Sequence, residues 1–570
     1  MTWRLHPLPP VPEATAAAVK AAFPKGNLYV DLRMELGAIY DDSLFADFYA
    51  ERGHPVDVAP WRLALVTVMQ YIEGLTDRQT ADAVRRCMDW KYALSLELTD
   101  PGFDFTLLHD FRQRLLLHDG AQNLLDTLLD LCKARGWMKT RGTQRTDSTY
   151  VVAAIRRLYY LECVQEAMRY ALNQLSEAAP QWVQGWAPLE WYERYGPRAE
   201  LFRLPKETSK RNALALVIGA DGYALLDALW HEVNARPLLE LPAVESLRQI
   251  WIQHYYRCTE PGFEDIRWRE TADQPPSAQL IQSPYDVEAR YSSKRSTNWV
   301  GYKVHLSETC DEGYPDLITQ VNTTLATTSD FVMGAPIEQD LAARDLLPGT
   351  HLLDSGYVVA DLLVSAPRDY QSDVVGPALR SSSRQGREGQ GYDVHSFAID
   401  WEAQQAYCPQ GHCSVKWTPG HSPEGHDVIR IRFDKATCDA CAVRPACTSS
   451  TKYPRQLTVK PQALHEAIEA AHQRQATPEF KAQYALRAGV ESTLSQGARR
   501  FDLRCRRSIG LTKTHLQQTI NATAMNLVRI ADWWRKGGVV QPKRRPSHFA
   551  RLAPPALCGL AVCEASATPS

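Results

Sequence analysis

The chain has 570 residues, which at roughly 100–200 residues per domain allows three to five domains. Hydrophobic residues make up 44% of the chain and charged residues 23%, so global disorder is excluded. Lys and Arg number 64 against 66 Asp and Glu, which excludes a uniformly basic protein that coats DNA. A nucleic-acid enzyme is compatible with this balance because binding needs only a local basic surface.

The sequence favours a cytoplasmic protein. No run of about 18 apolar residues appears, so we expect no membrane-spanning helix and no membrane partner. The N-terminus lacks the basic segment and apolar core of a signal peptide. Most cysteines are scattered singly, which is typical of buried thiols rather than of a disulfide framework.

Residues 1–140 are predicted to form an all-helical N-terminal domain. Apolar residues recur with helical spacing over 61–75, and Thr76 and Gln79 have the spacing of a capping box that starts a new helix. Further helices are expected from Thr106 and over 121–135. Short helices joined by tight turns are typical of DNA-binding modules, and equally of any small helical domain.

From Gly142 onward the pattern predicts an α/β fold with a mixed-sheet core. Extended runs are expected at 143–154, 212–229, 299–309 and 316–324, with a strand-to-helix step at 351–363. The core would comprise 141–379 and 461–535, with a helical insert at about 156–210. Residues 380–392 are predicted to be a mobile loop, 461–534 to be helical, and 536–570 to be a disordered tail.

Three acidic residues stand out along this core. Asp147 lies inside a predicted strand, where an unpaired carboxylate is disfavoured unless it is a strand-end or turn residue. Asp354 ends a strand run, where α/β folds place ligand-facing side chains, although a helix N-cap is a strong alternative. Glu491 shares one predicted helical face with Tyr484 and Arg487, a pattern that also fits a solvated salt bridge.

A basic segment follows Glu491. Between residues 481 and 513 the chain has eight Lys and Arg against two acids, which indicates a phosphate-binding surface on a chain with no overall basic excess. The candidate DNA-contacting residues are Tyr484, Arg487, Arg499, Arg500, Arg504, Arg506, Arg507 and Lys513. By contrast, His305 in a strand pattern favours a packed or surface histidine.

The words around the acids resemble those of a known family. TDSTYV, then HLLDSGYV, then Tyr-x2-Arg-x3-Glu with Arg-rich and GLTKT segments behind it, resemble the DDE transposases of bacterial insertion sequences. More narrowly, the chain is similar to the branch with a tyrosine–arginine–glutamate signature, of insertion-sequence type eleven-eighty-two. The similarity runs from about Gly53 to Trp534 and includes the central SPYDVEARYSSKRSTNWVGYKVHLSET. The chain departs from the signature at Ala498, where the family often has a basic residue, and Arg499 stands next to it.

The resemblance implies an RNase H-like core in which Asp147, Asp354 and Glu491 are catalytic and bind Mg²⁺ or Mn²⁺. In this interpretation Asp147 bridges two ions, and Asp354 and Glu491 each hold one. Tyr484 and Arg487 would contact the DNA backbone. The activity implied is cleavage at the inverted-repeat ends of an element and transfer of the 3′-hydroxyls into target DNA.

Five cysteines cluster at residues 408–447 and predict a small zinc-ribbon-like insert over 393–460. Cys408 and Cys413 form a C-x4-C pair, Cys438 and Cys441 form a C-x2-C pair, and Cys447 follows. Paired cysteines joined by a loop are typical of tetrahedral zinc sites, and a reducing compartment favours metal over disulfide. The ligand choice stays open because of the fifth cysteine and of His412, and a reduced insert without metal is the alternative.

The sequence therefore predicts a DNA transposase that acts on double-stranded DNA, assembles as a homodimer on paired ends, and works in the cytoplasm at the bacterial nucleoid. Two alternatives remain. One is an RNase H-like nuclease or domesticated derivative that cleaves without strand transfer. The other is a non-catalytic DNA-binding regulator, which a complete acid triad disfavours.

Overall fold

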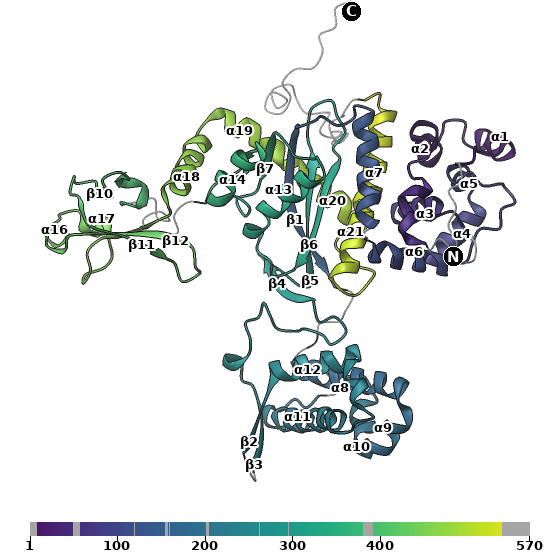
Figure 1. The fold of residues 1–570 in the computed structure, drawn as a ribbon, viewed down its shortest axis with the longest axis horizontal. Coiled ribbons are helices and arrows are strands. Elements are labelled where there is room, and N and C mark those ends of the chain that lie inside the picture. Colours follow the sequence, from purple (N-terminus) through teal and green to yellow (C-terminus); the bar gives the residue numbers. More distant parts are fainter. Residues whose placement is uncertain are drawn as a thin grey trace, which may run out of the picture.

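A computed structural model describes residues 8–49, 58–118, 120–153, 158, 160–200, 204–260, 263–294, 296–379 and 391–538. Figure 1 shows a central sheet with the N-terminal helices on one side, a helical insert below, and a small β-rich module at the opposite end. Most of the predicted loop at 380–392, the start of the predicted insert at 156–157 and the tail beyond 538 lie outside the described residues.

The central sheet is mixed. Its strands are β1 (Thr143–Val152), β4 (Arg290–Lys294), β5 (Thr297–Thr309), β6 (Ile318–Leu325), β7 (Thr350–Leu353) and β8 (Asp373–Val375). The order is β4–β5–β1–β7–β8, and β6 also pairs with β5. β5 is antiparallel to β1, β4 and β6, whereas β7 is parallel to both β1 and β8. β1 therefore lies where the sheet changes from antiparallel to parallel pairing.

The predicted strands at 143–154, 299–309 and 316–324 are confirmed as β1, β5 and β6. β1 carries Thr and Val residues that suit a strand, yet most of its polar side chains are buried. Each buried polar group has a partner: Thr146 Oγ1 lies 2.6 Å from both Ser307 Oγ and His351 Nε2. Paired in this way, polar residues occupy a central strand without the cost of unsatisfied groups.

The N-terminal segment is helical, as predicted. Its helices are α1 (Glu13–Ala22), α2 (Leu28–Leu36), η1 (Asp42–Phe48), α3 (Pro60–Glu73), α4 (Asp77–Arg86), α5 (Met88–Ala93), α6 (Thr106–Leu117) and α7 (Gly120–Ala134). The capping box is confirmed, because the Thr76 side chain accepts from Gln79 N and the Gln79 side chain accepts from Thr76 N. These helices share one continuous hydrophobic core with the sheet, so they do not pack as a detached unit.

α21 (Leu511–Arg535) joins the N-terminal helices to the sheet. It packs against α3 and α7 on one side and β6 on the other, and most of its residues are buried. Its Asn526 side chain pairs with the backbone of Ile318 at the start of β6, accepting at 2.8 Å and donating at 2.8 Å. A polar residue in the middle of a buried helix thereby fixes that helix against a strand edge.

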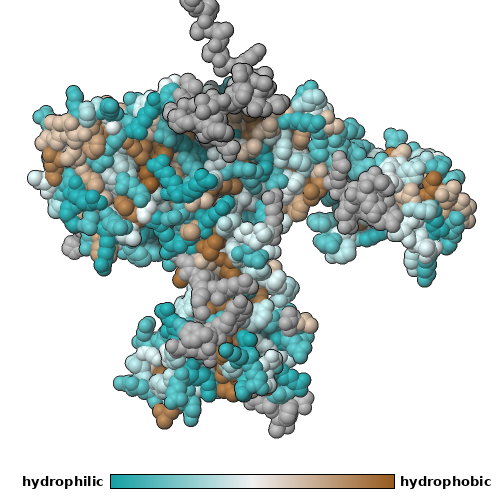
Figure 2. All heavy atoms as spheres, turned by 180° about the vertical axis from the view of Figure 1, so that it is seen from behind, coloured by the Kyte–Doolittle hydropathy of each residue, from teal (hydrophilic) through white to brown (hydrophobic). Residues whose placement is uncertain are grey.

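The helical insert has its own hydrophobic core and extends further than the predicted 156–210. Its elements are α8 (Tyr160–Ala178), α9 (Pro180–Trp186), α10 (Leu189–Tyr195), α11 (Thr208–His231), η3 (Arg236–Glu240), α12 (Pro242–His254), β2 (Tyr255–Glu260), β3 (Phe263–Trp268) and η4 (Thr271–Asp273). Figure 2 shows apolar residues gathered along the column that links the core to this insert.

The predicted extended run at 212–229 is wrong, because these residues form the middle of helix α11. Ala and Leu dominate the run, and both favour helix, whereas β-branched residues are few. Its two glycines lie against aromatic rings: a Cβ on Gly219 would come within 2.5 Å of Tyr255 and one on Gly222 within 2.2 Å of Trp251. The glycines therefore mark close helix packing rather than turns.

α11 is also the one described helix that is long and apolar enough to cross a membrane by length and composition. Its Ile218, Leu225 and Leu229 are fully buried in the core of the insert. A core helix passes the same length and composition test, so the observation is weak evidence for a membrane span.

The cysteine-containing module lies between the core strands and the C-terminal helices. Its elements are η6 (Val394–Ser396), β9 (Ala398–Asp400), β10 (Gln405–Tyr407), β11 (Ser414–His421), β12 (Asp427–Phe433), α16 (Lys435–Asp439), α17 (Arg444–Cys447) and β13 (Gln456–Val459). β11, β12 and β13 form one antiparallel sheet, and β9 pairs with β10. A small apolar core around Phe397, Ile431 and Phe433 holds them together.

The chain returns to the core through a series of helices, as predicted for 461–534. They are α18 (Gln462–Gln475), α19 (Pro478–Ala485), η7 (Leu486–Ala488), α20 (Gly489–Arg500) and α21. α18 packs against α14 (Ala360–Tyr370), the helix that follows β7. Before β7 the chain forms η5 (Asp330–Val332) and α13 (Gly334–Ala343). Tyr484, Arg487 and Glu491 thus lie on three successive elements rather than on one helix.

A buried carboxylate connects the sheet to these returning helices. Glu308 of β5 is fully buried, and its two oxygens accept from Arg145 Nε at 2.7 Å and Arg529 Nη1 at 2.7 Å. Thr493 Oγ1 donates to it as well, at 2.6 Å. Burial alone would raise the pKa of Glu308, but Arg529 and Arg145 lower it below its usual value. The network therefore stabilises the fold at neutral pH and loses that contribution when acid protonates Glu308.

We expect Glu308→Gln to lower the free energy of unfolding by about 3–5 kcal/mol, because it leaves two buried guanidinium groups without their shared counter-charge. Denaturant titration followed by circular dichroism measures the change. Glu312→Gln is the matched control, since Glu312 is exposed in the loop after β5. Equal stability of the two variants would mean that the network does not hold the core together.

Candidate active site

The sheet register brings the two predicted aspartates together. β1 and β7 are parallel neighbours, and Thr146 pairs with Leu353. The next residue along each strand direction is Asp147 on β1 and Asp354 just after β7, so the two acids stand side by side at one level of the sheet. Residues far apart in the sequence thus meet because parallel strands place their carboxyl ends at the same edge.

Arg487 binds both aspartates. Its Nη2 lies 2.7 Å from Asp147 Oδ2 and 3.5 Å from Asp354 Oδ2. The side chain of Asp147 is 12% exposed and that of Asp354 is 37% exposed, so one acid is largely enclosed and the other opens to solvent. Arg487 Nε is buried and has no hydrogen-bond partner among the described residues, so the guanidinium is only partly satisfied in this position.

The charges of the site act on each other. Burial raises the pKa of Asp147, although Arg487 and the backbone N–H of Ser148 oppose that shift. Burial alone would lower the pKa of Arg487, but Asp147, Tyr484 and Asp354 raise it above its usual value. The neighbouring Arg487 guanidinium therefore favours the ionised form of the enclosed aspartate.

Glu491 lies in the first turn of α20 and is exposed. Burial lowers the pKa of Arg487, whereas Asp147, Tyr484 and Asp354 raise it. The Glu491 carboxylate also raises this pKa, by a smaller amount. The structure does not bring Glu491 into hydrogen-bond contact with either aspartate. The third predicted acid therefore faces solvent beside the aspartate pair.

Tyr484 is half-buried beside the same charges. Its ring stacks on Phe480, with centroids 5.5 Å apart and planes 12° apart. Burial raises the pKa of its hydroxyl, with Arg487 lowering it and Asp354 and Asp147 raising it. Tyr484 packs against a small apolar cluster that includes Leu352 of β7 and Phe480, so it helps to fix the segment that carries Arg487.

A fourth carboxylate, Asp330, lies in this region and sequence reasoning missed it. Its Oδ1 is 2.9 Å from Lys303 Nζ, and its Oδ2 accepts from Ser148 Oγ at 3.2 Å. Burial alone would raise the pKa of Asp330, but Lys303 lowers it. Asp330 begins η5 just after its N-cap Ser329, and in the sequence it reads as an ordinary helix-start acid.

His305 and Tyr357 lie beneath these acids. His305 is buried, as one of its two sequence interpretations has it, and its Nδ1 is 2.6 Å from Tyr357 Oη. Burial lowers the pKa of His305 to about 4, so its ring is neutral at pH 7. Burial raises the pKa of Tyr357 well above its usual value, and Asp330, Asp147 and Asp354 raise it further. The Tyr357 hydroxyl therefore remains protonated next to these three carboxylates.

The predicted DNA-contacting arginines occupy different environments. Arg499 and Arg500 are exposed in the last turn of α20, where cations also favour the helix C-terminus. Arg504 lies next to the site: its Nε donates to Thr149 Oγ1 at 3.0 Å, and its guanidinium lies 4.6 Å above the Tyr150 ring. Lys513 is exposed near the start of α21.

Arg506 is a correction to the predicted DNA-contacting set. Its side chain is 0% exposed and pairs with the buried Asp286, while its guanidinium also lies 5.1 Å from the Tyr302 ring. A buried ion pair is not available to phosphate. Arg507 is partly exposed, and its Nη1 donates to Leu75 O at 3.0 Å, so it also joins the C-terminal segment to the N-terminal helices.

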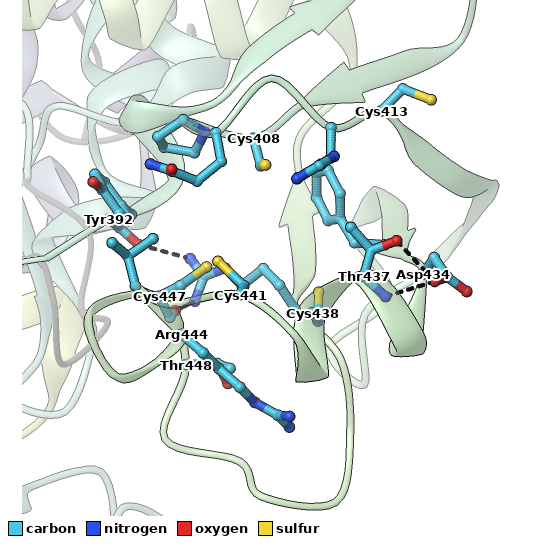
Figure 3. A pocket seen from close by; sticks show the side chains of 16 residues that line it. Tyr392, Cys408, Cys413, Asp434, Thr437, Cys438, Cys441, Arg444, Cys447 and Thr448 are labelled. Carbon is cyan, nitrogen blue, oxygen red and sulfur yellow. Dashed lines mark hydrogen bonds between the residues drawn. The ribbon is translucent and has the colours of Figure 1, made fainter.

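All five clustered cysteines line one small cavity of about 40 Å³ (Figure 3). The pKa of the Cys447 thiol is raised by burial, lowered by Arg455, and raised again by Cys438, Cys408 and Cys441, which shows that these four lie close together. Cys413 is exposed, and Figure 3 shows its sulfur pointing away from the others.

Hydrogen bonds on both sides of the cavity hold the backbone around these cysteines. Cys408 N donates to His412 O at 2.9 Å and Gly411 N to Cys408 O at 2.8 Å, with Gly411 at φ 81°, a conformation that glycine adopts without strain. Arg455 Nη1 donates to Cys447 O at 2.7 Å and fixes the other side of the cavity.

Comparison with known proteins gives two family matches. A family described as "Transposase domain" matches residues 18–114, which span α1 to α6. A family described as "Transposase DDE domain" matches residues 407–531, from the cysteines through Arg487 and Glu491 into α21. No curated protein and no solved structure matches the chain. The segment that carries the arginine of the aspartate pair thus lies within the match to the DDE domain, and the two matches together indicate a transposase function.

Proposed function

We propose that the chain is an insertion-sequence transposase of the type eleven-eighty-two branch. It would bind the inverted-repeat ends of its element, hydrolyse phosphodiesters there, and transfer the 3′-hydroxyl ends into target DNA. The observation that carries the proposal is the convergence of Asp147 and Asp354 on Arg487, four residues before Glu491. The tyrosine–arginine–glutamate signature at Tyr484, Arg487 and Glu491 supports the branch.

The proposed core is RNase H-like. The sheet order β6–β5–β1–β7–β8 supports it, since the first three strands are antiparallel and the last two run parallel to the central β1. In this arrangement one catalytic acid comes from the middle of the central strand, one from the end of its parallel neighbour, and one from a returning helix.

The acids fit Mg²⁺ or Mn²⁺. Both ions prefer hard oxygen ligands, and Asp147 and Asp354 already share one positive group, the Arg487 guanidinium. Asp147, Asp354 and Glu491 would hold the ions, which in phosphoryl transfer activate the attacking oxygen and stabilise the leaving oxygen. Arg487 would release the aspartates and bind a DNA phosphate, a partner that suits its planar fork.

DNA would pass over the basic residues near Glu491, namely the exposed Arg499, Arg500, Arg507 and Lys513 and the partly buried Arg504. The buried Arg506 is left out. The N-terminal helices would read the end sequence, and two protomers would assemble on paired ends because each end needs one active site. A protein of this kind would work on the chromosome in the bacterial cytoplasm.

The cysteine module would hold one structural Zn²⁺ through Cys408, Cys438, Cys441 and Cys447. The mutual proximity of these four thiols supports this choice, whereas Cys413 is exposed and its sulfur points away from them. Four thiolates are a usual tetrahedral zinc set, and a structural metal supplies folding energy to a module with so small an apolar core.

Asp147→Asn, Asp354→Asn and Glu491→Gln should each reduce Mg²⁺-dependent cleavage of element-end DNA by at least about 100-fold, since each removes a ligand charge while nearly preserving shape. DNA binding should persist because phosphate contacts elsewhere supply the affinity. Gel assays of cleavage and of DNA binding measure both quantities on the same protein preparations.

Asp369→Asn is the matched control, because Asp369 is exposed at the end of α14 and accepts from the neighbouring Arg368. Cleavage at the level of the control by any one of the three variants would remove that residue from the active site.

Replacing Arg499, Arg500 and Arg504 together by Ala should weaken binding to element ends and to unrelated duplexes alike. Each lost phosphate contact lowers the slope of log affinity against log salt by roughly 0.9. Fluorescence anisotropy over a salt series measures the slope. Arg248→Ala is the control, because Arg248 is exposed on α12 of the insert. An unchanged slope in the triple variant would place the DNA path elsewhere.

A further inference from the structure

Two histidines and a glutamate meet where the cysteine module joins α18. His395 belongs to η6 of the module, and Glu469 and His472 lie three residues apart on one face of α18. One ligand atom of each residue lies within 4.8 Å of those of the other two. None of the three residues belongs to the acid pair or to the cysteine cavity, so the cluster is separate from both.

The contacts within the cluster leave one nitrogen without a partner. His395 Nδ1 contacts Glu469 Oε1, and the rings of His395 and His472 lie 5.0 Å apart at 87°. His472 Nε2 is buried and has no hydrogen-bond partner among the described residues. A simple ion pair between His395 and Glu469 accounts for the first contact but leaves this buried nitrogen unsatisfied, which costs free energy.

We propose that His395, Glu469 and His472 bind a divalent transition-metal ion, with Zn²⁺ as the most suitable metal. Two imidazoles and one carboxylate are a recognised zinc ligand set, and imidazole in general suits this class of metals. His395 is partly exposed, which gives the ion a path from solvent. His465 Nε2, one turn earlier on α18, lies 4.0 Å from the same Glu469 Oε1 and adds another imidazole beside this carboxylate.

The metal would hold the module against the core. Its ligands come from the module on one side and from α18 on the other. α18 in turn packs against α14, the helix that follows Asp354 in the chain. α18 also leads through α19 to η7, which carries Arg487. A metal at this junction therefore sets the orientation of the module relative to the helices of the active site.

Cobalt titration of the full-length, reduced, metal-free protein tests the proposal without relying on activity. Co²⁺ bound to thiolates gives intense sulfur-to-metal charge-transfer absorption, whereas Co²⁺ bound to imidazole and carboxylate gives only weak visible bands. We expect one equivalent of the second kind in the wild-type protein. His472→Ala and Glu469→Gln should each weaken that equivalent by more than about tenfold, since even indirect partners of metal ligands contribute 10–100-fold.

Glu466→Gln is the matched control, because Glu466 is exposed on the same helix and accepts from Gln462. It should bind Co²⁺ like the wild type, and all four proteins should keep the same charge-transfer band from the cysteines. Weak visible bands of equal intensity and affinity in His472→Ala, Glu469→Gln and Glu466→Gln, or no such bands in the wild type, would reduce the cluster to a hydrogen-bonded ion pair. Because the cluster shares no residue with the acid triad, failure here would leave the proposed function standing.

Discussion

The buried Glu308 and its two arginines fix the strand that carries Asp147 and the helix that carries Glu491. Arg145 lies on β1 two residues before Asp147, and Arg529 lies on α21, so one carboxylate holds the central strand against the helix that joins the two halves of the core. Arg145 also donates to Leu486 O at 2.8 Å, in the residue before Arg487. A Cβ on Gly489 would come within 2.0 Å of its guanidinium, so α20 begins directly against Arg145. The same ionic network therefore fixes β1 and the start of the helix that carries Glu491.

On that framework the aspartate pair is held by a protein cation. Arg487 compensates Asp147, whose pKa is raised by burial, and it does so from a position where one of its own nitrogens is unsatisfied. A carboxyl group with a raised pKa takes up its proton at a higher pH than an ordinary aspartate. Cation binding at the pair should therefore weaken as pH falls through that raised value. In the proposed mechanism metal ions would replace Arg487 at the aspartates, and the arginine would bind a DNA phosphate.

Much of the fold follows from local patterns. The capping box at Thr76, the strand at Asp147 and the clustered cysteines each have a short-range signal in the sequence, and the family resemblance places the acids. The helix at 208–231 has no such short-range signal, because an apolar run of that kind fits strand and helix alike. Its glycines pack against Trp251 and Tyr255, which lie far along the chain. Burial of Arg506 and the approach of Asp330 also depend on partners distant in the chain, which no local pattern reports.

The central claim is that Asp147, Asp354 and Glu491 hold divalent ions in place of Arg487. Electron paramagnetic resonance of Mn²⁺ titrated into the protein on element-end DNA tests it most directly, since free and bound Mn²⁺ give different signals. We predict DNA-dependent Mn²⁺ binding that weakens by at least about tenfold in each of the three carboxamide variants and is unchanged in Asp369→Asn. Mn²⁺ binding of equal affinity in the wild type and in Asp147→Asn would contradict the assignment.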